Sequence, residues 1–190
     1  MNIHNNVTGL ILAGGQARRM GGTDKGLITL AGRSMISYII DALKPQVNSI
    51  VINANRNTSE YQEYGYPVIS DEITDYQGPL AGMASGLKYC STEYIVTVPC
   101  DGPLLVNDYV STLLHAARDK HSKISVAHDG QRLQPVYALI HTHLLDDLND
   151  FLHSGERKID RWYEKHQFAE ADFSSCPEMF TNINTPEDLE

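Results

Sequence analysis

A glycine-rich, basic segment near the start of the chain has the residue types that bind phosphate. Residues 12–25 read LAGGQARRMGGTDK and contain four glycines together with Arg18, Arg19 and Lys25. Glycines let the backbone approach a ligand closely and turn successive N–H groups toward an anion, and the three cations add charge there. A surface loop with incidental basic residues is the alternative, but the apolar run at 8–13, typical of a buried strand, favours a triphosphate-binding loop.

Two common phosphate motifs are missing from this segment. The Walker motif needs Gly-Lys followed by Ser or Thr, and the dinucleotide fingerprint needs G-x-G-x-x-G. Residues 12–25 match neither pattern. A dehydrogenase of the doubly wound class is therefore disfavoured.

An aspartate follows a buried-strand pattern in the middle of the chain. Asp101 comes just after the apolar run at 94–98, which places it at the carboxyl edge of a sheet, level with the glycine-rich loop. Magnesium takes one or two carboxylates together with phosphate oxygens and water. Asp101 is therefore a candidate metal ligand, and a solvated turn aspartate before Gly-Pro is the alternative.

Further polar residues are expected at the same edge. Asn53 and Asp71 each end a strand pattern, where an amide and a carboxylate could hold ribose hydroxyls or base N–H groups; helix capping is the alternative. Asn182 and Asn184 could add neutral oxygens near the metal, although asparagines before Thr-Pro are also common in turns.

The segment Gly78–Gly82 has little side-chain bulk where a helix is expected to begin. Gly78, Pro79, Leu80 and Gly82 could let a planar base lie against the backbone. A tight helix start without a ligand is equally consistent with the pattern.

Hydrophobic periodicity predicts alternating strands and helices in the first half of the chain. Strands are expected at 8–13, 49–53, 67–70 and 94–98, and helices at 35–43, at 58–64, after Pro79 and around 110–117. In the second half, strands at 124–128 and 134–140 flank the turn signal Asp129-Gly130, and helices are expected at 144–152 and from Thr185. This order predicts an α/β fold with a mostly parallel sheet, helices on both faces and a small antiparallel excursion.

Length and composition limit the class of protein. The 190 residues suit a single domain, 1–190, with a nucleotide-binding half of about 1–105 and an acceptor half of about 106–190. The net charge of −9 argues against general binding of nucleic acid or anionic membranes. Three cysteines without C-x-x-C spacing, and no export signal or apolar span, favour the cytoplasm.

Several segments together resemble one enzyme family. Leu-Ala-Gly-Gly at 12–15, Arg-Met-Gly at 19–21 and Asp-Lys-Gly at 24–26 resemble the start of the molybdenum cofactor guanylyltransferases. Similar family segments recur in order at 51–56, 78–82, 99–103, 128–130, 154–157 and 182–187. One departure is Gly102, where the family leads us to expect threonine or another small polar residue.

The resemblance implies a three-layer, Rossmann-like nucleotidyltransferase fold and a specific reaction. GTP would donate GMP to the phosphate of molybdopterin, with Mg²⁺, or Mn²⁺ in its place. Catalytic roles would fall to Lys25, Asp101 and Arg19, with Asp101 as the metal ligand. The implied nucleotide-binding residues are Leu12, Ala13, Gly14, Gly15, Lys25, Asn53, Asp71, Gly78, Pro79, Leu80, Gly82 and Asp101. Arg157, Asn182 and Asn184 are the implied acceptor-binding residues.

Three other interpretations stay open. The chain could be a molybdopterin cytidylyltransferase, a nucleotidyltransferase for a sugar phosphate, or a nucleotide-binding adaptor that delivers cofactor without chemistry. No histidine is assigned to catalysis. A monomer is favoured, with transient contacts to cofactor-biosynthesis proteins and apo-molybdoenzymes.

Overall fold

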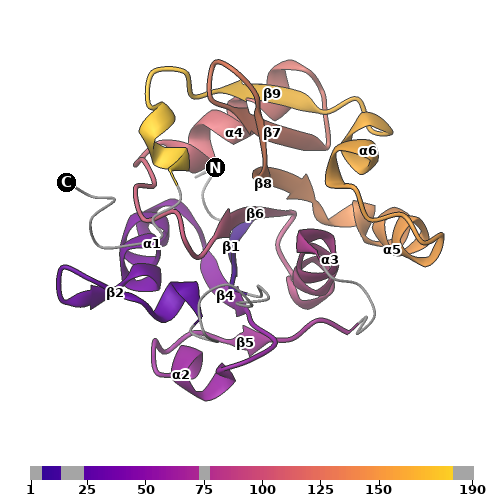
Figure 1. Cartoon of the computed structure of the whole chain (residues 1–190). Helices are drawn as coiled ribbons and strands as arrows, with labels where there is room; N and C mark the ends of the chain where they lie inside the picture. The colour runs from indigo at the N-terminus through magenta and orange to yellow at the C-terminus, as the bar shows by residue number, and fades with distance from the viewer. Residues whose placement is uncertain (1–5, 14–23, 73–77, 182–190) are drawn as a thin grey trace.

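A seven-stranded sheet runs through the chain, seen in a computed structural model that describes residues 6–13, 24–72 and 78–181. Its strands are β1 (Val7–Leu12), β4 (Ser49–Asn53), β5 (Val68–Ile69), β6 (Tyr94–Pro99), β7 (Ile124–His128), β8 (Leu133–His141) and β9 (Ala169–Asp172). Their order is β5-β4-β1-β6-β8-β7-β9, stacked from bottom to top in Figure 1. Strand β8 is antiparallel to β6 and β7, and the other pairings are parallel.

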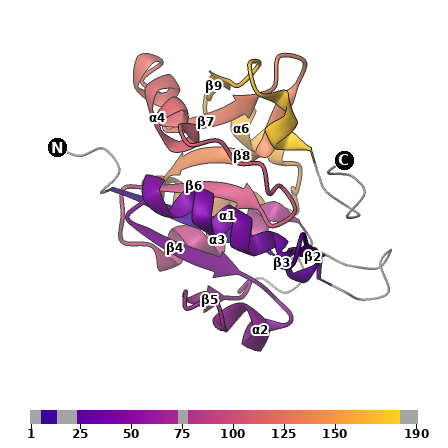
Figure 2. The same ribbon diagram turned by 90° about the vertical axis from the view of Figure 1, so that its left-hand side faces the viewer.

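Helices cover both faces of this sheet. On one face lie α1 (Met35–Leu43) and α4 (Tyr109–Asp119), and on the other lie α3 (Pro79–Tyr89), α5 (Leu145–His153) and α6 (Ile159–Glu164) (Figure 1). The short helix α2 (Thr58–Gln62) lies beside β5. Figure 2 shows α1 in front of the sheet. The predicted three-layer α/β architecture is confirmed.

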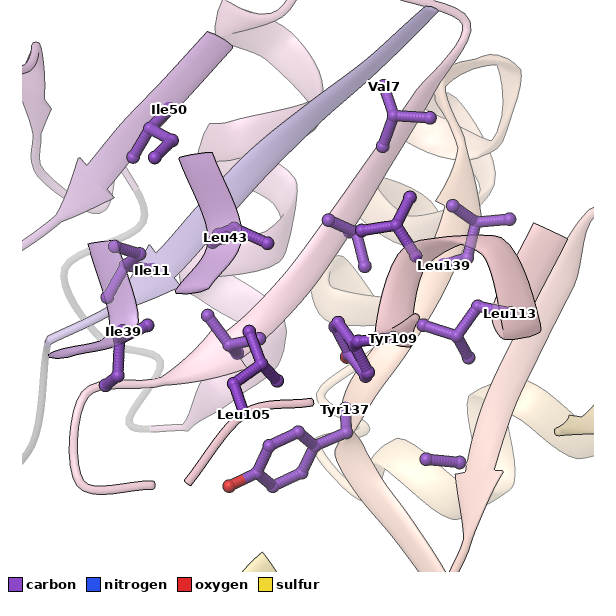
Figure 3. Close-up of a cluster of buried hydrophobic side chains, with 14 of the residues drawn as sticks. Val7, Ile11, Ile39, Leu43, Ile50, Leu105, Tyr109, Leu113, Tyr137 and Leu139 are labelled. Atoms are coloured by element: carbon purple, nitrogen blue, oxygen red, sulfur yellow. The ribbon is translucent and has the colours of Figure 1, made fainter. Parts of the chain in front are cut away.

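Strand alternation builds a core on each face. In β1, Val7 and Ile11 join the core under α1 and α4, whereas Leu10 joins the core under α3, α5 and α6. Figure 3 shows part of the first core, including Ile11, Leu43 and Leu113. The two cores fix the central strand from both sides, which holds its carboxyl end in place.

The remaining elements are short. They are the two-stranded sheet of β2 (Thr29–Leu30) and β3 (Arg33–Ser34), and the 3₁₀ turns η2 (Lys25–Leu27), η3 (Lys44–Gln46), η4 (Thr142–Leu144) and η5 (Pro177–Phe180). In the part of the chain that is described, no helix combines the length and apolarity needed to cross a bilayer.

The sequence prediction missed three strands and one α-helix and shifted some bounds. The hairpin around Asp129-Gly130 is confirmed, but the helix expected at 58–64 ends at Gln62, and the strand expected at 67–70 is only Val68–Ile69. Neither β2–β3 nor α6 nor β9 was predicted. Strand β9 reads AEAD and has no β-branched residue, so its place is set by pairing with β7. The helix expected from Thr185 lies outside the described residues.

Candidate active site

The carboxyl end of β1 is hydrogen-bonded to the ends of both neighbouring strands, β4 and β6. The Ala13 amide donates to the Asn53 carbonyl at 2.8 Å, and the Cys100 amide donates to the Leu12 carbonyl at 3.1 Å. The chain leaves β1 toward β4 on one side and later returns to β6 on the other. This is the switch point of an open α/β sheet, where ligands bind beyond the strand ends.

Lys25 and Asp101 form an ion pair at this switch point. The Lys25 Nζ atom lies 2.9 Å from the Asp101 Oδ2 atom, although the residues are 76 positions apart in the chain. The side chains are 34% and 15% exposed, so the pair is partly open to solvent. Lys25 begins η2, and Asp101 follows β6 by two residues. The structure thus brings together two of the three predicted catalytic residues.

The residue before Lys25 is anchored in the protein. Asp24 is buried, its Oδ1 atom lies 3.6 Å from the Arg56 Nη2 atom, and its Oδ2 atom accepts a 3.4 Å hydrogen bond from the Asn57 amide. Burial raises the pKa of Asp24, while the nearby Arg56 charge acts in the opposite direction. Asp24 therefore ties the start of η2 to the segment after β4. In the sequence, Asp24 stands out only as the first residue of the Asp-Lys-Gly segment at 24–26.

A second polar cluster lies at the ends of β4 and β5. The Asn53 amide donates to Asp71 Oδ1 at 2.9 Å, and the Asn55 amide donates to Asp71 Oδ2 at 2.8 Å. The Asp71 backbone N–H donates back to Asn55 Oδ1 at 2.8 Å. Asn53 and Asp71 lie at the same edge of the sheet, as their strand-end positions predicted, and the structure adds that they are hydrogen-bonded to each other. Asn55 was missed, although the repeat Asn53-Ala-Asn55 is its visible signal.

The N-terminus of α3 packs against this cluster. Pro79 is the first residue of α3, and the Ala81 amide donates to the Gly78 carbonyl at 3.3 Å. A Cβ atom on Gly82 would overlap Asn53 Oδ1 and lie 2.8 Å from Leu12 Cδ2. Glycine at 82 is therefore needed to admit the Asn53 side chain. Leu80 and Gly82 are both buried, and the positive end of the helix dipole points toward the strand ends.

Most of the other predicted site residues lie outside the part of the chain that the structure describes. Gly14, Gly15, Arg18, Arg19, Asn182 and Asn184 lie outside the described residues. Arg157 is exposed between α5 and α6. Within the described ranges, no group of three or more His, Cys, Asp or Glu side chains is arranged to hold a metal ion. The partly exposed carboxylate of Asp101 is a hard oxygen ligand that a phosphate-bound Mg²⁺ could use.

Two solved structures with the same fold carry names from nucleotide chemistry. Molybdopterin-guanine dinucleotide biosynthesis protein A from Archaeoglobus fulgidus superposes with a TM-score of 0.77, at 21% identity, over 96% of this chain and 94% of that chain. The 4-diphosphocytidyl-2C-methyl-D-erythritol synthase from Anaerococcus prevotii superposes with a TM-score of 0.73, at 13% identity, over 98% and 93%. The fold is therefore that of the nucleotidyltransferases.

Sequence comparison narrows this class. A family model described as the MobA-like NTP transferase domain matches residues 9–170. The molybdenum cofactor guanylyltransferases of Shewanella sp. strain MR-4 and Shewanella sediminis are 50% and 51% identical over 181 residues, which is 95% of this chain and 92% of each relative. The chain therefore belongs to the MobA-like NTP transferase family, in the branch of the molybdenum cofactor guanylyltransferases.

Proposed function

We propose that this protein transfers GMP from GTP to the phosphate of molybdopterin, giving molybdopterin guanine dinucleotide and pyrophosphate. The observation that carries the proposal is the Lys25–Asp101 ion pair at the switch point of a guanylyltransferase-family sheet. A cation and a carboxylate, both partly exposed at the strand ends, are the charges that a metal-bound triphosphate needs.

The acceptor needs no protein base. The second pKa of a phosphate monoester is about 6, so most of the molybdopterin phosphate is already a dianion at neutral pH. One of its oxygens attacks the α-phosphorus of GTP, a new P–O bond forms, and the bond to the β-phosphate oxygen breaks with pyrophosphate leaving. Catalysis then depends on alignment and on charge stabilisation by the protein.

Lys25 and Asp101 have separate tasks in this proposal. Lys25 donates to the α- and β-phosphate oxygens and stabilises the charge that develops as pyrophosphate leaves, with Arg19 and the amides of Gly14 and Gly15 assisting. Asp101 would hold Mg²⁺, or Mn²⁺, which supplies charge neutralisation on the phosphate oxygens when bound. Removing divalent ions with EDTA is expected to stop transfer, and adding Mg²⁺ back is expected to restore it.

The second cluster is proposed to bind the nucleoside. Asp71, held by the amides of Asn53 and Asn55, has carboxylate oxygens suited to ribose hydroxyls or to the N1–H and N2–H₂ donors of guanine. Backbone amides near residue 14 and at the start of α3 would donate to guanine O6. The Ala13 amide already donates to the Asn53 carbonyl, and Pro79 has no amide hydrogen. Adenine in this position would set donor against donor, and an unpaired buried polar group costs about 1–3 kcal/mol.

The acceptor is proposed to bind in the second half of the chain. Arg157, Asn182 and Asn184 are proposed to bind molybdopterin, and Arg157 has the charge to meet its phosphate. Contacts with cofactor-biosynthesis proteins and apo-molybdoenzymes would be transient, and the reaction would take place in the cytoplasm.

One incubation tests the proposal against its rivals. The protein is mixed with molybdopterin, Mg²⁺ and each nucleoside triphosphate in turn, and the product is identified by mass. Molybdopterin guanine dinucleotide with stoichiometric pyrophosphate is the expected result. A cytosine dinucleotide would indicate the cytidylyltransferase, and binding of GTP without pyrophosphate release would indicate the delivery adaptor.

A further inference from the structure

Two tyrosine hydroxyls are buried without a hydrogen-bond partner, and both flank the Asp101 segment. Within the described ranges, the oxygens of Tyr61 and Tyr137 are the buried side-chain polar atoms that lack a partner. Buried hydroxyls normally find one, because a desolvated, unpaired group destabilises the fold. The Tyr61 hydroxyl faces Gly26, next to Lys25, and the Tyr137 hydroxyl faces Gly102, next to Asp101.

The Tyr137 hydroxyl occupies the space of a side chain on residue 102. A Cβ atom on Gly102 would overlap this hydroxyl oxygen and lie 3.2 Å from the ring carbon that carries it. Gly102 is not among the glycines with positive φ, so its backbone could accept another residue. Glycine is therefore required at 102 by the tyrosine and not by the backbone, which gives a physical reason for the departure from the family pattern.

The ring of Tyr137 is held firmly, so the position of its hydroxyl is defined. The ring makes edge-to-face contacts with Tyr109 and Phe180, at centroid distances of 6.2 and 5.0 Å, and Tyr137 is only 4% exposed. In Figure 3 its hydroxyl points away from Leu113 and Leu139. A tyrosine hydroxyl carries its proton at neutral pH, so this group can donate a hydrogen bond. Burial and the neighbouring Asp101 charge raise the pKa of Tyr137 above its usual value, in the same direction.

We propose that Tyr137 is a positioning residue for Asp101 in the nucleotide-bound state, an inference that rests on the proposed function. In the free protein Asp101 accepts a hydrogen bond from Lys25. When Mg²⁺ and GTP bind, Lys25 turns to the phosphates, and the Tyr137 hydroxyl replaces it as the donor that orients the Asp101 carboxylate. The destabilising, unpaired hydroxyl is then explained, because it gains its partner only with ligand.

Tyr137→Phe tests the positioning role of the hydroxyl without changing the packing of the ring. The variant keeps the ring and removes an unpaired group, so its melting temperature is expected to equal or exceed that of the wild type. Its Kd for GTP in the presence of Mg²⁺, measured by calorimetric titration without molybdopterin, is expected to rise about tenfold. A lowered melting temperature, or an unchanged Kd, would overturn the proposal.

A buried tyrosine away from the site is the matched control. The Tyr163 hydroxyl donates to the Pro135 carbonyl at 2.7 Å, so it already has its partner. Tyr163→Phe is expected to lower the melting temperature and to leave the Kd for Mg²⁺-GTP unchanged. If both variants weakened binding alike, the effect of Tyr137→Phe would be a general consequence of losing a core hydroxyl, and the proposal would fail.

A double-variant cycle gives the sharpest result. Gly102→Ser alone is expected to lower the melting temperature because its Cβ atom overlaps the tyrosine hydroxyl. Gly102→Ser combined with Tyr137→Phe removes the overlap with the hydroxyl oxygen, although the Cβ atom stays 3.2 Å from the ring carbon, and puts a new hydroxyl near the same place. The melting temperature should rise above that of Gly102→Ser alone, and the Kd for Mg²⁺-GTP should recover to within about threefold of wild type. A double variant that binds no better than Tyr137→Phe would contradict the proposal.

The same titrations tell a failure of this proposal from a failure of the proposed function. Wild-type protein that bound no GTP would refute the proposed function.

Discussion

Two polar clusters at the same edge of the sheet are built from different chemistry. On the β1–β6 side, a lysine and an aspartate meet as full charges, and both are partly exposed. On the β4–β5 side, Asp71 is held by two neutral amides from Asn53 and Asn55, and Asn53 is only 2% exposed. Two charges that can exchange partners suit phosphates and a metal, whereas a rigid amide–carboxylate cluster suits the neutral hydrogen-bonding groups of a nucleoside.

The comparison predicts different kinetic signatures for the two clusters. Variants of the charged pair should lower kcat, because charge stabilisation matters most in the transition state. Variants of the amide cluster should mainly raise KM for GTP, because its contacts are the same in ground state and transition state.

Replacing Asp101 should have the largest effect. Asp101→Ala removes the proposed metal ligand from a strand end, so transfer should fall by at least about 10³-fold while the melting temperature changes little. Pyrophosphate release and circular dichroism measure the two quantities. Near-normal turnover by a folded Asp101→Ala protein would refute the assignment of Asp101.

Lys25→Ala should have the second-largest effect. We expect kcat to fall by about 10²-fold, because the charge that stabilises the leaving pyrophosphate is lost, with little loss of stability. The matched control is Lys88→Ala, which also breaks a lysine–carboxylate pair, since Lys88 Nζ lies 2.6 Å from Glu72 Oε2 on the exposed surface. The control should leave kcat unchanged. A Lys25→Ala rate within about twofold of wild type, worth roughly 0.4 kcal/mol, would make Lys25 a surface residue without a catalytic role.

Substituting two glycines of α3 in turn distinguishes an effect on the site from an effect on core packing. Gly82→Ala would push the Asn53 amide away from Asp71 and should raise KM for GTP about tenfold. Gly86→Ala would meet the Leu10 side chain at 2.5 Å and should lower only the melting temperature. Equal KM values in the two variants would show that the Asn53 position does not affect the nucleotide.

Asn55→Ala should have the smallest effect. It removes one of the two amide donors to Asp71 at an exposed position, so KM for GTP should rise by only about threefold, without a change in kcat. A change in kcat larger than that in KM would mean that the second cluster also takes part in the chemical step.

The strand-end rule explains what could be predicted from the sequence. Asp101, Asn53 and Asp71 are predicted to lie at one edge, level with the glycine-rich loop, because parallel strands end there. The hydrogen bonds Lys25–Asp101 and Asn53–Asp71, across 76 and 18 positions of the chain, are seen only in the structure. The α/β alternation followed from hydrophobic periodicity. These predictions use only local patterns and one topological rule.

Residues defined by tertiary contacts could not be predicted in this way. Asp24 is held in place by Arg56 from another segment, and Tyr137 appears in the sequence as an ordinary residue of an apolar strand. That Gly102 leaves space for the Tyr137 hydroxyl depends on the pairing of β6 with β8, which the periodicity does not give. Strand β9 was missed for a similar reason, because pairing with β7 outweighs its weak local preference.

The choice of nucleotide tests the central claim most directly. GTP, ATP and CTP are supplied together at equal concentration with molybdopterin and Mg²⁺, and the dinucleotide products are separated and quantified by mass. Two mismatched polar groups would give discrimination on the order of 10² to 10⁴, so the guanine product should dominate. Equal use of ATP, or a clear preference for CTP, would contradict the guanylyltransferase account.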